Sequence, residues 1–123
     1  MGPVCDRLRP LVLFLAGLIG AAGVALAAAA THMGGALLGP ASAMCLAHAP
    51  AMLALFAAHR LLRPATGAGL LMGLGTVLFA GDLVLKEFLG ASLFPMAAPS
   101  GGILMMLGWL LAGLGAFMPQ PKA

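Results

Sequence analysis

The sequence predicts an all-α integral membrane protein in which four transmembrane helices form an antiparallel bundle. Hydrophobic residues make up 63% of the 123 residues, and the mean hydropathy is +1.12. Charged residues make up only 7%, whereas a soluble domain is usually about a quarter charged. Most of these charges lie between long apolar stretches. A chain of this length cannot bury so much apolar surface in its own core, so lipid must cover the remainder.

The first two predicted helices follow from apolar length and from the residues that flank it. Each crossing of the hydrocarbon layer, roughly 30 Å thick, needs about 20 mostly apolar residues in a helix. Residues 11–30 meet this requirement directly after Arg9 and Pro10. Residues 41–61 do so after Pro40. Proline fits the start of a helix, because its missing N–H would have no partner there.

The third and fourth predicted helices are bounded in the same way. Residues 68–85 form an apolar segment that ends at Lys86. Residues 101–117 follow Pro99 and precede Pro119. Because the connections are short, successive helices should run in opposite directions, and residues 1–123 should form a single transmembrane domain.

The basic residues predict which side each connection faces. Cytoplasmic loops of membrane proteins carry an excess of Lys and Arg. Five of the six basic residues fall in the N-terminal tail, the second connection and the C-terminal tail, namely Arg7, Arg9, Arg60, Arg63 and Lys122. The sequence therefore predicts that both termini lie in the cytoplasm.

A cleaved secretory signal is the alternative for the first segment. The basic start, the apolar run and the small residues 27–30 resemble such a signal. However, the apolar run is about 20 residues long, whereas a signal core usually has about 7–15. We therefore expect the segment to be retained as a transmembrane helix.

Small residues at helical spacing predict where the helices pack, because close backbone approach drives association in lipid. Such residues recur every four positions on the first and second helices, and the third and fourth carry shorter repeats. We expect packing roles for Gly17, Ala21, Gly69, Gly73, Gly101, Gly102 and Gly108, and also for Trp109, which lies well inside the fourth helix. These faces pack within the bundle in the simplest interpretation, and they mediate self-association or docking to a larger complex in the alternative.

Ionisable residues within the predicted helices form a candidate polar cluster, since such groups are costly in a membrane. His48 lies about eight residues into the second helix, roughly 12 Å below the surface at 1.5 Å per residue. Asp82 and Lys86 are four residues apart on the third helix and can pair. His32 ends the first helix on the same side.

Three hypotheses explain these four residues. In the first, His48 hydrogen-bonds Asp82 or a backbone carbonyl and holds the helices in register. In the second, His48 and Asp82 form a proton or small-ligand site. In the third, His32 and His48 bind a metal or haem, although the established metal motifs use tighter spacing or more ligands. The structural role is the expectation, with no metal and no cofactor.

Short sequence patterns in every helix resemble a known family. They are ATHMG at residues 30–34, HA at 48–49, LFAGDL at 78–83, PSGG at 99–102 and GW at 108–109. The chain resembles the YgdD-like small membrane proteins, classified as domain of unknown function 423, over residues 17–117. The resemblance implies a four-helix protein of the bacterial inner membrane with no established activity. Asp82 departs from the pattern, because the family usually has a small hydroxyl residue there.

The sequence predicts a non-enzymatic protein. It contains no GxSxG, CxxC, P-loop or HExxH motif, and a net charge of +3 is too small to indicate nucleic-acid binding. We expect an accessory, assembly or stabilising subunit, whose partners are the lipid bilayer and either a membrane complex or further copies of the chain. The alternative is a small transporter or proton-coupled binding protein that uses His48 and Asp82.

Overall fold

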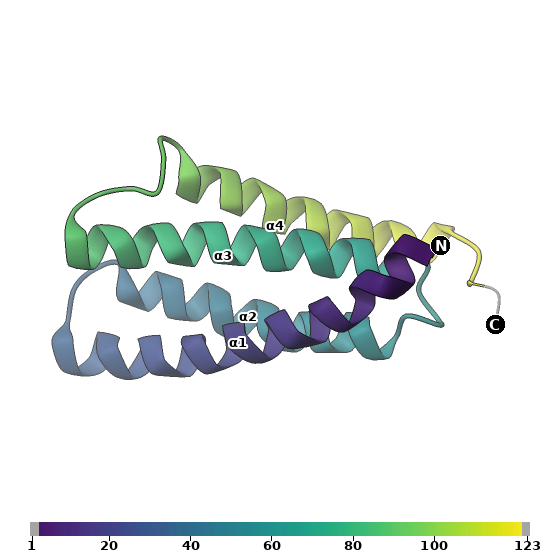
Figure 1. Ribbon diagram of the computed structural model, residues 1–123, viewed down its shortest axis with the longest axis horizontal. Coiled ribbons are helices and arrows are strands. Elements are labelled where there is room, and N and C mark those ends of the chain that lie inside the picture. Colours follow the sequence, from purple (N-terminus) through teal and green to yellow (C-terminus); the bar gives the residue numbers. More distant parts are fainter. Residues whose placement is uncertain (1–2, 122–123) are drawn as a thin grey trace.

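The computed structural model describes residues 3–121, which form four long helices and one short 3₁₀ turn. The helices are α1 (Pro3–Met33), α2 (Leu38–Ala57), α3 (Ala65–Leu89) and α4 (Ala97–Leu114), and η1 (Gly115–Phe117) follows α4. They run antiparallel, so the α1–α2 and α3–α4 connections lie at one end and the N- and C-terminal segments at the other (Figure 1). The predicted all-α four-helix fold is confirmed.

The helix bounds differ most from the prediction at α1. The helix begins at Pro3 and continues through Pro10, which the sequence placed ahead of the first span. Proline removes the hydrogen bond to the carbonyl four residues earlier, here that of Asp6. Asp6 is exposed, so solvent can satisfy this carbonyl. Arg7 and Arg9 therefore lie on the first turns of a helix and not in an extended tail.

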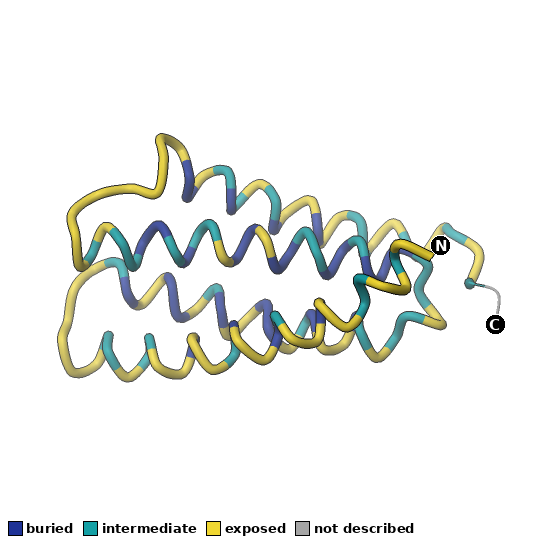
Figure 2. Tube along the Cα trace, viewed as in Figure 1, coloured by how far each residue is buried: buried dark blue, intermediate teal, exposed yellow. Residues whose placement is uncertain are grey.

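All four helices are long and apolar enough to cross a membrane. Their outward surfaces carry large apolar side chains, among them Phe14, Leu53, Leu74 and Leu110. The buried residues are concentrated on α3 and on the faces turned toward it, whereas much of α1 and α4 is exposed (Figure 2). Apolar residues that are exposed over whole helices fit a lipid environment. The chain is therefore a multi-pass membrane protein.

The central element is α3, which packs against each of the other helices. The extensive contacts join α3 to α4, α1 to α2 and α2 to α3, and a smaller contact joins α1 to α3. In the described part of the chain, α4 therefore packs extensively on α3 alone. In Figure 1, α4 and the α1–α2 pair lie on opposite sides of α3.

Glycine allows α3 and α4 to approach until their backbones touch. A Cβ atom built on Gly101 would lie 2.5 Å from the carbonyl oxygen of Gly75 and 2.6 Å from the backbone nitrogen of Phe79. A Cβ atom on Gly108 would lie 2.7 Å from Cγ of Met72. A side chain at either position would overlap these atoms unless the two helices moved apart. The sequence indicated Gly101 and Gly108, but not Gly75, on which the closest approach depends.

The opposite face of α3 receives larger side chains from α1 and α2. A Cβ atom on Gly69 would lie 2.8 Å from Cγ1 of Val12, and one on Gly73 would lie 2.9 Å from Cε of Met52. Both Val12 and Met52 are almost completely buried. On this face the glycines of α3 leave space that Val12 of α1 and Met52 of α2 fill.

This arrangement corrects the expected packing face of α1. Gly17 and Ala21 are exposed, and nothing lies within 4 Å of a Cβ atom built on Gly17. The buried face of α1 instead comprises Val12, Ala16, Ile19 and Gly23. On this face Val12 fills the space at Gly69 of α3, whereas Gly23 receives Leu46 of α2. Gly102 on α4 likewise has no neighbour within 4 Å of a Cβ position.

Adjacent glycines on α4 provide a matched test of the α3–α4 contact. Gly101→Ala should lower the free energy of unfolding by about 1–3 kcal/mol, because the new methyl group overlaps the α3 backbone. Gly102→Ala should leave it unchanged or raise it by up to about 1 kcal/mol, because alanine favours a helix and the position is open. Reversible unfolding in mixed micelles measures both. Equal effects of the two substitutions would contradict the close approach.

Candidate functional site

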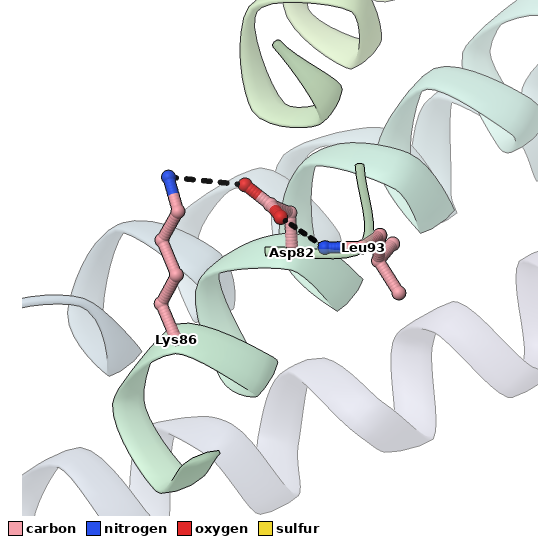
Figure 3. Close-up of polar contacts among 3 residues, drawn as sticks. All are labelled: Asp82, Lys86 and Leu93. Atoms are coloured by element: carbon pink, nitrogen blue, oxygen red, sulfur yellow. Dashed lines mark hydrogen bonds and ion pairs between the residues drawn. The ribbon is translucent and has the colours of Figure 1, made fainter. Parts of the chain in front are cut away.

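Asp82 is the most deeply buried charged residue described, with 1% of its surface exposed. One carboxylate oxygen, Oδ1, accepts a hydrogen bond from the backbone N–H of Leu93 at 2.9 Å. The other, Oδ2, forms an ion pair with Nζ of Lys86 at 3.2 Å (Figure 3). Lys86 lies one turn further along α3, as the sequence predicted, and is partly exposed. The cost of burying the charge is therefore offset by a cation and a backbone donor.

The bond to Leu93 ties the α3–α4 connection back onto α3. At the end of α3 the chain turns at Gly90, whose φ of 70° is in the left-handed region that glycine favours. The N–H of Gly90 closes the helix on the carbonyl of Lys86. Leu93 then lies beside Asp82, eleven residues away in sequence. Asp82 thus holds the α3–α4 connection against the end of α3.

A second carboxylate on the same helix end holds the other connection. Oε1 of Glu87 accepts a hydrogen bond from the backbone N–H of Leu37 at 3.2 Å, in the connection between α1 and α2. Gly35 lies against the same carboxylate, and a Cβ atom there would overlap it. Glu87 directly follows Lys86 in the sequence, which gave no sign of this contact. Two acidic residues of α3 therefore fasten both connections at this end of the bundle.

His48 forms a different polar contact, between α2 and α4. The side chain is 4% exposed, and Nδ1 lies 2.8 Å from the carbonyl oxygen of Met44. The indole N–H of Trp109 donates to Nε2 at 3.0 Å. These partners assign the proton to Nδ1 and make the imidazole neutral. The two rings meet edge to face, with centroids 5.8 Å apart.

The predicted cluster of four residues therefore separates into two sites and one exposed residue. Asp82 binds the connection before α4, whereas His48 binds Trp109, which lies twelve residues after Ala97, roughly 18 Å along the helix axis. No hydrogen bond, ion pair or ring contact joins His48 to Asp82 among residues 3–121. His32 is exposed at the end of α1. His48 lies at the middle of α2, whereas Asp82 lies seven residues before the end of α3. The two residues are therefore at different depths in the bundle, contrary to the expected cluster.

The partners of His48 are relevant to the hypotheses that it binds a proton, a small ligand, a metal or haem. Both ring nitrogens of His48 already have partners. Within the described residues, no three His, Cys, Asp or Glu side chains lie close enough together to hold a metal ion. His48 contacts the backbone carbonyl of Met44, which the first hypothesis allowed, and Trp109 takes the place that this hypothesis gave to Asp82.

Apolar grooves also lie between helices at the surface, and two of them are distinguished by their lining residues. The larger, about 630 Å³, lies between α1 and α3 and is lined by Leu18, Leu26, Val84 and Phe88 among others. The smaller, about 350 Å³, lies between α2 and α4 over Met72 of α3. Trp109 lines this second groove, so the ring that His48 holds also forms part of its wall.

A double-mutant cycle tests the bond between His48 and Trp109. His48→Leu and Trp109→Phe should each destabilise the protein, and their coupling energy should be about 0.5–1.5 kcal/mol, the range for side-chain hydrogen bonds between transmembrane helices. Unfolding in mixed micelles measures each variant. The control cycle pairs Trp109→Phe with Thr76→Val, because the Thr76 hydroxyl binds a carbonyl of its own helix. A His48–Trp109 coupling no larger than that of the control would contradict the bond.

Comparison with known proteins places this fold in a family. A family model described as "Protein of unknown function (DUF423)" matches residues 19–102, from the middle of α1 to the first turns of α4. No curated protein and no solved structure matches the chain. The match covers more than half of the 123 residues and agrees with the resemblance in the sequence patterns. The chain belongs to the DUF423 family of proteins of unknown function.

Proposed function

We propose that this protein is a non-enzymatic accessory or assembly subunit that binds a transmembrane helix of another membrane protein through the outward face of α1. The observation that carries the proposal is the exposure of Gly17, Ala21 and Ala25, which recur every four residues on that helix. Small residues at this spacing are typical of helix–helix interfaces in membranes. In this fold, they face away from the chain's own core.

Glycines on α3 and α4 differ from Gly17, because they are covered by other helices of the chain. Gly69, Gly73, Gly101 and Gly108 all lie against neighbouring helices of the same chain. Nothing comparable covers Gly17. Only 22% of the residues in the most apolar stretch of α1 are buried, so many of its side chains are open to lipid or to a partner.

The matching surface on a partner is a second transmembrane helix with its own small residues. Lipid tails are as apolar as leucine, so apolarity alone does not favour association of helices. A flat surface of Gly and Ala does, because the two backbones can approach closely and gain dispersion contacts. Transport by a His48–Asp82 pair is a weaker proposal, because these side chains do not touch.

Site-specific photocrosslinking in native membranes tests the proposed face. A photoreactive residue at Ala21 should give protein crosslinks, whereas the same residue at Leu107, on the exposed face of α4, should give mainly lipid adducts. Gly17→Leu should abolish the crosslinks without unfolding the protein, because the added side chain meets no neighbour. Gly102→Leu is the matched control at another open glycine. Lipid adducts alone at Ala21 would overturn the proposal.

We also infer that both termini face the cytoplasm of a bacterial inner membrane. Arg7, Arg9, Arg60 and Arg63 all lie at the end of the bundle where the chain starts and ends, and basic residues favour the cytoplasmic side. Lys122, which the sequence adds to this group, lies outside the described residues. A green fluorescent protein fused to the C-terminus should fluoresce, and an alkaline phosphatase fused there should be inactive. An active phosphatase would reverse the orientation.

A further inference from the structure

We propose that the groove between α2 and α4 binds one acyl chain of an anionic phospholipid, whose phosphate group is held by Arg60 and Arg63. The site lies at the basic end of the bundle, defined here as the end that carries Arg7, Arg9, Arg60 and Arg63. It is independent of the outward face of α1.

The groove has the apolar lining that an acyl chain requires. Its walls come from α2, α4 and the start of the α2–α3 connection, and all of its lining residues are apolar, namely Ala51, Ala54, Leu55, Ala58, Leu62, Met72, Trp109 and Ala112. Ala51 and Trp109 lie nearer the membrane interior, whereas Ala58 and Leu62 lie at the basic end. The groove therefore runs along α2 from the basic end toward the bilayer centre.

The packing of the helices explains why this groove is open. Gly75, Gly101 and Gly108 draw α4 onto α3, and α2 packs on another side of α3. Between α2 and α4 the polar contact that crosses is the hydrogen bond from Trp109 to His48. Beyond this bond, alanines line both walls and leave space that their small side chains do not fill.

The basic end carries four arginines and, among residues 3–121, one carboxylate, that of Asp6, so its charge is positive. Among residues 3–121 the ion pair is that between Asp82 and Lys86, at the opposite end. Arg9 is held by His59, at 3.5 Å, and by the ring of Phe56, whose centroid lies 4.6 Å from the guanidinium carbon. Arg63 uses its Nε–H to bind the carbonyl of Pro119 at 3.2 Å, which leaves its two NH₂ groups available.

The positions of Arg60 and Arg63 favour the groove between α2 and α4, rather than the groove between α1 and α3, as the lipid site. Both lie in the connection that contains Leu62, a groove residue, and Arg60 is exposed. Arginine binds phosphate through two parallel N–H groups, and arginine near a membrane surface attracts anionic lipids. The larger groove between α1 and α3 ends near Phe88 and Leu93, where the acidic residues of α3 lie, so the same headgroup is not favoured there.

Tryptophan fluorescence gives a direct measurement, because Trp109 is the single tryptophan of the chain and lines the groove. The full-length protein is reconstituted into bilayers that contain phosphatidylglycerol or phosphatidylcholine with the same brominated acyl chains, which quench tryptophan on contact. We expect stronger quenching by phosphatidylglycerol at equal mole fraction. Arg60→Gln with Arg63→Gln should reduce this preference by about fivefold for each arginine removed.

Matched variants separate the groove from general charge attraction. Ala54→Phe fills the groove and should abolish the preference, whereas Ala43→Phe, on the outward face of α2, should retain it. Arg7→Gln removes a charge from the same end on α1 and should also retain it. Equal quenching by the two lipids overturns the proposal, and so does a preference that survives Ala54→Phe, since the headgroup would then bind without the groove.

Native mass spectrometry separates the two sources of phosphate. The detergent-solubilised protein is mixed with phosphatidylglycerol, with phosphatidylcholine or with inorganic phosphate. A retained phosphatidylglycerol adduct that Ala54→Phe removes supports the proposal. An adduct with inorganic phosphate but none with the lipid would mean that the arginines bind a free anion, and the proposal would fail.

Discussion

The structure depends on how closely the backbone of α3 approaches its neighbours. Within a membrane, water does not drive helices together, so association requires dense packing. Gly75 and Gly101 meet where neither helix has a side chain, and Gly69 receives Val12 on the opposite face. Because α3 has small residues on both sides, it can hold α4 and the α1–α2 pair at the same time. The remaining surface of α1 and α4 is left to lipid or to partners.

Polar residues complete this framework at one end of the bundle and between α2 and α4. Asp82 and Glu87 hold the two connections at one end of the bundle, and His48 holds Trp109 between α2 and α4. Each of these groups has partners that reduce the cost of burial. A buried aspartate beside a lysine on a transmembrane helix is often a sign of transport chemistry. Here Asp82 pairs with Lys86 and also holds the α3–α4 connection through the N–H of Leu93.

Two different surfaces of the bundle are proposed to bind partners. The outward face of α1 offers small residues to another helix, and the groove between α2 and α4 offers an apolar channel beside Arg60 and Arg63. The first surface is flat and suits a backbone, whereas the second is hollow and suits a flexible chain with an anionic headgroup. Since α1 and α4 share no extensive contact in the described residues, a partner helix and a lipid can bind without competing for the same surface.

The sequence by itself determined the class of the protein, its four helices and the end at which its arginines gather. These properties follow from the length and composition of apolar segments, which a linear chain displays directly. It also predicted the Asp82–Lys86 pair, because residues four apart on a helix share a face. Only the tertiary structure decided which small residues pack inside the chain and which face outward, and that His48 meets Trp109 and not Asp82. Those outcomes depend on the rotation of each helix about its axis, and this rotation is set by the side chains of neighbouring helices that are distant in sequence.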